Sequence, residues 1–378
     1  MSSPHSLGRP CNSLAALIAL AGLILSGCDH AKDLVEQGKK QAEDIQKSIE
    51  GKAEQPAASS DANVPATANS GAAPTSTPTA PPAANPVAPP PTPTAADPSS
   101  LIDAFVKAAP ETKTDAMLQA LGALPEESRA RLTECNLAGS RVSDAGLAEV
   151  AKFPNLFLVD LTGCTHIGDT ALAPLVNLRL LEVLSLERCS VTNDAVSHLR
   201  KLTNLKVLNL NKTAINDAGI AGLAPLTRLE ELSINSTKIN GSGFRKVPWA
   251  ASLRVLNAAA SLVGQELDAL KGYRKLEELT LYGAHVSDQT VAALKGHSQL
   301  RVLHLSENFL SDVGAKKLTG LSGLEVLTLK GNRVSDNCLP TFKVCRKLTM
   351  FADSETMITS SGREFIKKFA PQCAFTPP

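Results

Sequence analysis

The segment Leu205–Arg228 reads LKVLNLNKTAINDAGIAGLAPLTR, and its pattern returns along most of the chain. The next segment begins at Leu229 with LEELSINSTKINGSG, and the preceding one begins at Leu181 with LEVLSLERCSVTNDA. Leucines in the same phase recur every 23 to 25 residues, at Leu132, Leu156, Leu181, Leu205, Leu229, Leu253, Leu276, Leu300, Leu324 and Leu348. A constant period in this range is typical of a solenoid, in which stacked units share one core.

Each unit combines a short strand with a short helix. Leu208 and Leu210 alternate with polar residues, which predicts a half-buried strand whose leucines face the core. Ile220 and Leu223 have helical spacing and are expected to close the core from the other side. Asp217 and its equivalents follow an Asn or Ser that can cap the helix, and an acidic residue suits the first helical turn. Because one unit cannot bury its apolar face alone, the units are expected to stack.

The pattern L-x-x-L-x-L-x-x-(N/C/T)-x-(I/V)-x-D resembles the leucine-rich repeat family, in particular its cysteine-containing subclass and bacterial relatives, over ten repeats at 132–362. This resemblance implies an α/β fold: a curved solenoid with a parallel concave sheet and short convex helices. The family's Asn or Cys position, called the ladder position below, carries Ser140, Cys164, Cys189, Thr213, Thr237, Ser261, Ala284, Asn308, Asn332 and Thr356. Hydroxyl groups can still bond to loop backbone, so Ala284 is the expected weak point.

Residues 1–28 are predicted to be a lipoprotein signal peptide. Arg9 supplies a sparse positive charge, and the apolar stretch 14–25 is too short to span a bilayer core of about 30 Å. The motif Leu25-Ser26-Gly27-Cys28 resembles the bacterial lipobox. The resemblance implies that Cys28 carries lipid and anchors the chain to a membrane of the bacterial cell envelope, with the solenoid in the periplasm or outside. An ordinary cleaved secretory signal with an incidental cysteine is the alternative.

The remaining segments outside the repeats differ sharply in composition. Residues 29–54 are highly charged and are predicted to form a helical juxtamembrane spacer, while 55–98 hold 12 of the 24 prolines and predict a disordered linker. Residues 99–131 contain helix signals at Ser100 and Thr114 and are interpreted as a helical N-terminal cap, because solenoids need closed ends. Residues 363–378 are interpreted as the C-terminal cap and tail.

Several function classes are disfavoured by the sequence. Basic and acidic residues number 38 and 37, whereas nucleic-acid binding needs a basic excess on one face. Hydrolase, metalloprotease and phosphate-loop motifs are missing, no C-x-x-C pair is present, and the histidines are scattered. We therefore expect no enzyme activity, metal site or cofactor. An exported protein permits disulfides, so a bridge between Cys345 and Cys373 near the C-terminal cap is a further hypothesis.

The concave face is the predicted binding surface, because curved solenoids bind through it. Its candidate residues are Phe157, Asp160, Glu187, Arg188, Asn209, Asn211, Lys212, Tyr282, His304 and Lys330. Tyr282, His304, Arg188 and Phe157 are the expected anchors, since large side chains dominate interface energies. Trp249 falls in the convex half of its repeat and is expected to serve packing.

These features predict a lipid-anchored, non-catalytic scaffold that binds an unidentified protein or glycan. Two alternatives stay open: a structural spacer without a specific ligand, and a substrate-recognition subunit of an enzyme complex, as in some cysteine-containing relatives. The lipobox and the missing adaptor motif argue against the second alternative.

Overall fold

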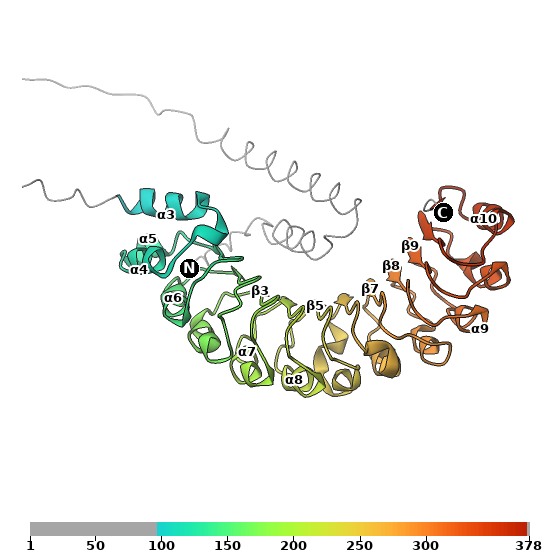
Figure 1. Cartoon of the computed structure of the whole chain (residues 1–378), viewed down its shortest axis with the longest axis horizontal. Helices are drawn as coiled ribbons and strands as arrows, with labels where there is room; N and C mark the ends of the chain where they lie inside the picture. Colours follow the sequence, from blue (N-terminus) through green and yellow to red (C-terminus); the bar gives the residue numbers. More distant parts are fainter. Residues whose placement is uncertain (1–96, 376–378) are drawn as a thin grey trace, which may run out of the picture. The chain divides into compact units, whose positions relative to one another are not determined.

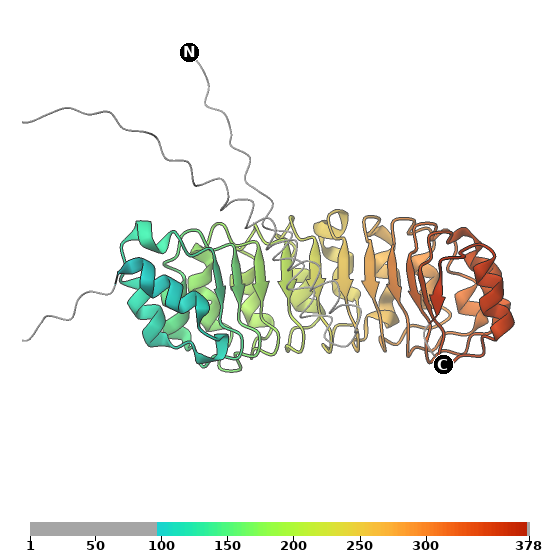
Figure 2. The ribbon, with the colours of Figure 1, turned by 90° about the horizontal axis from the view of Figure 1, so that it is seen from above.

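The computed structural model describes residues 97–375, which form one curved stack of coils (Figure 1). The predictions for 1–28, with lipidation of Cys28, for 29–54 and for nearly all of 55–98 lie outside the described residues. An eleven-stranded sheet, with strands in chain order, lines the concave side, and helices cover the convex side (Figures 1 and 2). The predicted curved α/β solenoid is thereby confirmed.

All strand pairs are parallel and keep one register, as in the pairing of Val207 with Glu231. Equivalent residues of successive repeats therefore form rows across the sheet, and neighbouring residues in a row are about 4.8 Å apart. The strands are β1 (Glu134–Asn136), β2 (Leu158–Asp160), β3 (Val183–Ser185), β4 (Val207–Asn209), β5 (Glu231–Ser233), β6 (Val255–Asn257), β7 (Glu278–Thr280), β8 (Val302–His304), β9 (Val326–Thr328), β10 (Met350–Ala352) and β11 (Ala374–Phe375).

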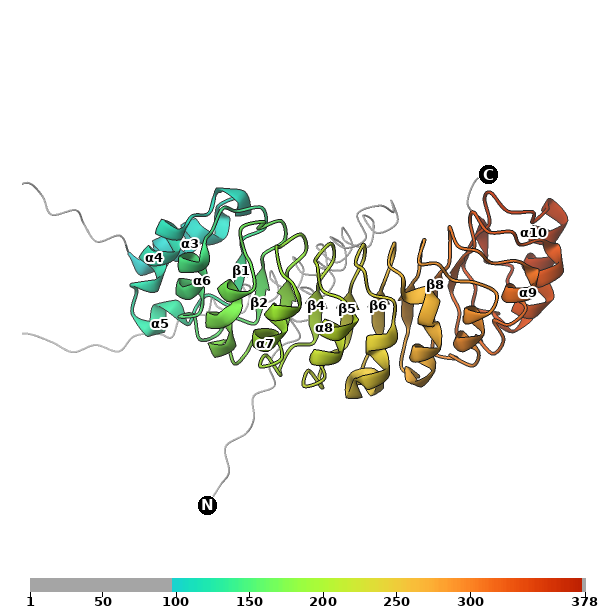
Figure 3. The ribbon, with the colours of Figure 1, turned by 60° about the horizontal axis from the view of Figure 1, so that its bottom comes forward.

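Short helices form the convex side (Figure 3). They are α6 (Asp144–Val150), η2 (Thr170–Asn177), η3 (Asn193–Ala195), α7 (Val196–Leu199), α8 (Asp217–Gly222), η4 (Ser242–Lys246), η5 (Pro248–Ala251), η6 (Val263–Gly272), η7 (Thr290–Leu294), α9 (Asp312–Ala315), η8 (Asp336–Val344) and α10 (Ser360–Lys367). Ahead of the first repeat lie α3 (Pro98–Lys107), η1 (Pro110–Thr112), α4 (Asp115–Gly122) and α5 (Glu126–Arg129). Buried side chains of α3 and α4, Phe105 and Leu118 among them, join the repeat core.

The C-terminal end departs from the predicted boundaries. The predicted end of the repeats at 362 falls inside α10, and the segment interpreted as cap and tail contributes a further strand, β11. Met350 pairs with Ala374 in this last step of the sheet. The solenoid therefore ends in an additional, shortened repeat whose strand lacks the leucine pattern.

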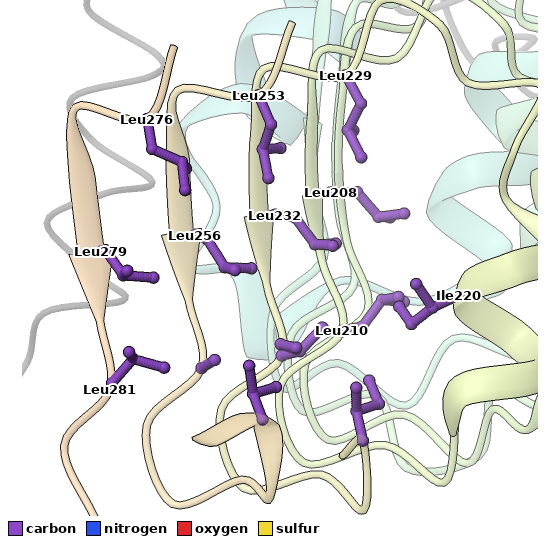
Figure 4. Close-up of a cluster of buried hydrophobic side chains, with 14 of the residues drawn as sticks. Leu208, Leu210, Ile220, Leu229, Leu232, Leu253, Leu256, Leu276, Leu279 and Leu281 are labelled. Atoms are coloured by element: carbon purple, nitrogen blue, oxygen red, sulfur yellow. The ribbon is translucent and has the colours of Figure 1, made fainter. Parts of the chain in front are cut away.

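The leucines of successive strands share one apolar interior. Leu208, Leu232, Leu256 and Leu279 lie side by side in one row across neighbouring strands and are fully buried (Figure 4). Asp353 occupies a core-leucine position in the last full repeat and is buried against Arg363, with Nε–Oδ2 and Nη2–Oδ1 distances of 2.8 and 3.1 Å. The bidentate ion pair compensates the burial of that charge.

Side chains at the ladder position form hydrogen bonds to backbone carbonyls of their own repeat, of the preceding repeat, or of both. Thr213 donates to a carbonyl of its own repeat at 2.7 Å, whereas the Cys164 thiol reaches a carbonyl of the preceding repeat at 3.1 Å. The Asn308 amide reaches both repeats, at 3.0 and 2.7 Å. The more distant of these acceptors is Leu281, in the repeat of Ala284. The expected weak point at Ala284 is thus bridged by its neighbour.

A second ladder of side chains runs along the starts of the convex helices. Asp312 accepts the Ser335 backbone N–H at 2.7 Å and the Ser335 hydroxyl at 2.6 Å, so each Asp fixes the N-cap residue of the following repeat. The same contact joins Asp115 to Ser143, Asp169 to Thr192, Asp288 to Ser311 and Asp336 to Thr359. The recurring aspartates are therefore structural, as their position at the helix starts predicted.

Replacing Asp288 with alanine is expected to lower the free energy of unfolding by about 1–3 kcal/mol, because two donors of Ser311 lose their charged acceptor. Asp144→Ala is the matched control, because the equivalent residue of the next repeat is Gly168, which has no hydroxyl to donate. Urea denaturation measures both variants. Equal losses in the two variants would show that the ladder contact does not stabilise the stack.

Candidate functional site

The concave surface consists of two rows of side chains, one from the first and one from the third residue of each strand. Of these two rows, only the row of third residues contains binding residues proposed from the sequence. The middle residue of each three-residue strand points into the core, so alternation places the first and third residues on the concave side, although in β2, β3 and β4 these are buried as well. The first residues are largely apolar, Leu158, Val183, Val207, Val255, Val302, Val326 and Met350, interrupted by Glu134, Glu231 and Glu278. The sequence signal was the alternation itself, which places positions two apart on one face. The concave surface is thus a mixed apolar and polar strip.

Three of the predicted binding residues stabilise the loops that follow the strands. The Asp160 carboxylate accepts the Thr162 N–H at 2.9 Å, and the Asn209 amide oxygen accepts the Asn211 N–H at 3.0 Å. The amide oxygen of Asn211 accepts the Asn235 N–H of the next repeat at 2.6 Å. Asp160, Asn209 and Asn211 are buried. Their side-chain oxygens are therefore already used in hydrogen bonds that stabilise the loops.

Glu187 is the centre of a polar cluster in the N-terminal half of the sheet. Its carboxylate lies 3.3 Å from Lys212 Nζ and 3.4 Å from the amides of Asn209 and Asn211. Arg188 and Lys212 occupy left-handed backbone conformations, with φ of 59° and 55°. Their side chains point to solvent from this turn, and the Arg188 guanidinium is 3.9 Å from Glu187. The structure thus brings four of the predicted residues together around one carboxylate.

Phe157 lies apart from that cluster, in the position just before the strands. In later repeats this position carries a row of alternating charges, and the half-buried Phe157 comes directly before the first of them, Glu182. The row contains ion pairs Glu182–Lys206 (3.0 Å), Arg254–Glu277 (2.8 Å) and Arg301–Glu325 (2.9 Å). These exposed pairs contribute about 0–1 kcal/mol each, so their main effect is to give this edge a neutral, hydrated surface.

His304 and Lys330 belong to the C-terminal half of the sheet. His304 is half-buried on β8, its Nδ1 lies 3.3 Å from Thr328 Oγ1, and burial lowers the pKa of its ring. Lys330 Nζ pairs with Glu355 at 3.1 Å. Phe157 on the β2 side and Tyr282 after β7 are five strands apart, on the order of 24 Å. The predicted residues therefore lie in separate places along the sheet rather than in one site.

Tyr282 belongs to an exposed apolar surface that the sequence analysis missed. Its side chain is 49 % exposed, Phe309 is 65 % exposed and Met357 is 59 % exposed. The rings of His285 and Phe309 lie 5.8 Å apart. The parallel bridges Ser287–Phe309, Ser311–Arg333 and Ser335–Met357 show that one loop position stacks from repeat to repeat, with the exposed Arg333 between Phe309 and Met357. We call Tyr282, His285, Phe309 and Met357 the edge patch.

Two glutamates of the first concave row interact across the strand between them. Burial, together with the charges of Glu278 and Glu230, raises the pKa of Glu231 to about 7, and Arg254 opposes this shift. Burial likewise raises the pKa of Glu278. At neutral pH this part of the concave face therefore resists full ionisation.

Glu231→Gln is expected to remove a pH dependence of stability. The raised pKa means that the folded protein holds the Glu231 proton more tightly than the unfolded chain, so stability is highest below about pH 4.5 and falls as pH rises toward 7. The fall amounts to about 1–3 kcal/mol. Thermal denaturation at pH 4.5 and 8 measures it, with the exposed Glu127→Gln as control. An unchanged pH profile in Glu231→Gln would contradict the assigned burial.

The predicted bridge between Cys345 and Cys373 is wrong for this structure. Both are free, buried thiols, and Cys345 Sγ donates to the Leu321 carbonyl at 3.2 Å, while Cys373 Sγ lies 3.5 Å from the Ala374 carbonyl. Burial raises the pKa of Cys345 to about 12 and of Cys373 to about 11. Each sulfur thus packs as a neutral group with its own acceptor.

One histidine and the tryptophan serve the core. His297 is buried between the carbonyls of Leu294 and Leu270, at 3.1 and 3.2 Å. Trp249 is buried in η5, as predicted. Within 97–375, no three His, Cys, Asp or Glu side chains converge as metal ligands. In the same span, no helix has the length and apolar character needed to cross a membrane.

Comparison with known proteins agrees with the repeat geometry. A leucine-rich repeat family profile matches residues 274–334, and a second leucine-rich repeat profile matches residues 201–224. No match was found among curated proteins. Among solved structures, a leucine-rich repeat protein of Leptospira interrogans is 16 % identical with a TM-score of 0.49, covering 69 % of this chain and 80 % of its own.

Two further structures are similar at the same low level. An internalin of Listeria monocytogenes is 19 % identical, with a TM-score of 0.44 and coverage of 74 % of this chain and 96 % of its own. The mouse RP105/MD-1 complex contains a chain 17 % identical, with a TM-score of 0.46 and coverage of 71 % and 58 %. Residues 201–224 and 274–334 thus match leucine-rich repeat profiles, and the eleven-stranded parallel sheet continues the same coil geometry in a curved leucine-rich-repeat solenoid.

Proposed function

We propose that this protein is a non-catalytic scaffold that binds a protein partner through the edge patch and the adjoining concave face. The observation that carries the proposal is the exposure of Tyr282 and Phe309 on two consecutive repeats, with the exposed Met357 two repeats further along. Single exposed apolar residues are normal, but aromatic and Met side chains gathered on one surface are typical of protein interfaces. The ion pair Lys330–Glu355 joins the repeat of Met357 to the repeat before it and would supply a polar rim.

The concave face extends this surface. His304 on β8, Val302 beside it and Val326 on β9 are half-buried, so a partner that covers the edge patch would also bury part of them. A protein chain suits such a mixed apolar and polar strip better than a glycan does, because the valines offer no hydrogen bonds to hydroxyl groups. A glycan remains the competing ligand, and the assay below distinguishes the two by protease treatment of the captured material.

The proposal includes a lipid anchor at Cys28 in a bacterial cell envelope. It is supported by the order of charged residue, apolar stretch and Leu25-Ser26-Gly27-Cys28. Acyl chains on Cys28 would anchor the chain without a spanning helix. Cys28→Ser should move the protein from the membrane fraction to the soluble fraction, whereas an incidental cysteine would leave its fractionation unchanged.

The double substitution Tyr282→Ala with Phe309→Ala is expected to weaken partner binding by about 100-fold or more, because each buried aromatic anchor contributes about 2 kcal/mol. Val313→Ala is the matched control, since Val313 is 62 % exposed but lies in the convex helix α9. Crosslinked capture from intact cells identifies the partner, and titration of the purified pair gives Kd. Unchanged capture of every partner would favour the structural spacer instead.

A further inference from the structure

The C-terminal end of the solenoid contains an open, solvent-facing cavity of about 560 Å³ that is separate from the edge patch. Its lining consists of Lys343 and Arg346 at the end of η8, and of Phe365, Lys368 and Phe369 on and just after α10. The volume falls within the range of about 300–1,000 Å³ of small-molecule sites. The cavity lies between two consecutive convex helices at their C-terminal ends.

Two phenyl rings form the apolar part of this cavity. The ring centroids of Phe365 and Phe369 are 5.9 Å apart in an edge-to-face arrangement, and both side chains are only partly buried. Lys343 Nζ lies 5.3 Å from the centroid of Phe365, within the distance of a cation–π contact. The ammonium group is therefore held over the ring at the cavity wall.

The charged part of the lining has a single sign. Three cations and no carboxylate line the cavity. Across residues 97–375, none of Lys343, Arg346 and Lys368 forms an ion pair with an acidic side chain. Lysine and arginine only donate hydrogen bonds, and phenyl rings offer no ordinary acceptor. A ligand must therefore bring acceptor oxygens, and a negative charge would relieve the mutual repulsion of the cations.

We propose that this cavity, called the anion pocket below, binds a small organic anion: a phosphate or carboxylate group on a body with an apolar face. The anionic group would lie among Lys343, Arg346 and Lys368, and the apolar face would lie against Phe365 and Phe369. Cations at helix C-termini also complement the helix dipole. That effect explains neither Arg346, which follows the end of η8, nor the partly bare phenyl rings beside it.

Phenyl phosphate is the probe, with inorganic phosphate and phenol as its two halves, and isothermal titration of the full chain carrying Cys28→Ser measures binding. We expect phenyl phosphate to bind several-fold more tightly than inorganic phosphate, because the ring adds apolar contact, and phenol alone not to bind. Raising the salt concentration should weaken binding, since the cations are exposed.

The double variant Lys343→Gln with Lys368→Gln should weaken phenyl phosphate binding at least about tenfold, because two charge-assisted contacts are lost. Lys347→Gln with Lys367→Gln is the matched control, since it removes the same charge from adjacent exposed lysines that do not line the cavity. Equal losses in both pairs would overturn the proposal in favour of non-specific attraction. Failure of phenyl phosphate to bind the protein that retains all its lysines would overturn the proposal directly.

The source of the anion is tested with vesicles of phosphatidylcholine with and without phosphatidylglycerol. Vesicle binding that requires phosphatidylglycerol and is lost in Lys343→Gln with Lys368→Gln identifies a lipid headgroup as the ligand. Binding of phenyl phosphate without such vesicle binding identifies a soluble anion. The variant Tyr282→Ala with Phe309→Ala should retain phenyl phosphate binding, so failure of the anion pocket and failure of the edge patch are distinguishable.

Discussion

Trp249→Ala is expected to lower the free energy of unfolding by about 3–5 kcal/mol, the usual loss for a large aromatic side chain removed from a core. Trp249 is 1 % exposed, and its ring lies edge-to-face to Phe244 and Tyr273 at centroid distances of 6.0 and 6.3 Å. Its Nε1 donates to the Leu223 carbonyl at 3.1 Å. Alanine would leave both a cavity and an acceptor without its donor.

This effect should be large because the convex side is built differently here. The Asp contacts between helix starts stop after Asp217 and resume at Asp288, and Trp249, Phe244 and Tyr273 lie in the interval. Aromatic side chains therefore pack the convex side in the repeats that lack the Asp contacts between helix starts. Phe309→Ala is the control, since Phe309 is exposed, and its loss should be below about 0.5 kcal/mol. Similar losses in the two variants, measured by urea denaturation, would contradict the packing role of Trp249.

Gly314→Ala is expected to cost about 2–4 kcal/mol, because a methyl group there has no room. It would overlap the Asp288 carboxylate and lie 2.8 Å from the Asp288 Cα, so backbone must shift. The shift would also strain the Asp288–Ser311 contact between the two repeats. The motif Ser-Asp-x-Gly therefore has a joint meaning: Ser caps, Asp accepts from the next repeat, and Gly makes room for the preceding Asp.

Gly272→Ala provides the comparison, since a methyl group there meets no atom within 4 Å. Its effect should stay within about 0.5 kcal/mol. The two alanine variants differ in the packing around the added methyl group, so the difference between their denaturation midpoints isolates the close approach of the repeats. A Gly314→Ala protein as stable as Gly272→Ala would show that the coils can separate without cost.

The fold could be predicted because it repeats. Leu205, Leu208 and Leu210 recur in phase, and every recurrence adds evidence for the same coil. The last repeat was missed for the opposite reason, because Ala374–Phe375 carry no leucine pattern, although they pair with β10 and the Phe375 ring packs on Phe351 at 6.2 Å. Local propensity cannot reveal a strand that exists because its neighbour offers an unpaired edge.

The candidate site was predicted less well, because the exposed side chains that form it do not recur at a fixed spacing in the sequence. Tyr282 was found, since large side chains next to strands are conspicuous, but Phe309 and Met357 occupy a loop position filled elsewhere by Ala214 or Ser190. The roles of Asp160, Asn209 and Asn211 depend on which backbone N–H they meet, and only the three-dimensional turn decides that. The anion pocket combines two helices through tertiary contact, so no linear motif announces it.

Photo-crosslinking in intact cells tests the proposed binding surface most directly. A photoreactive phenylalanine analogue would replace Tyr282 or Phe309 in the edge patch, and Val313 in α9 would carry it as an equally exposed convex control. We predict one discrete, protease-sensitive adduct from 282 and from 309 and none from 313. Adducts that are absent at 282 and 309, or equally strong at 313, would contradict the assignment of the edge patch as the contact surface.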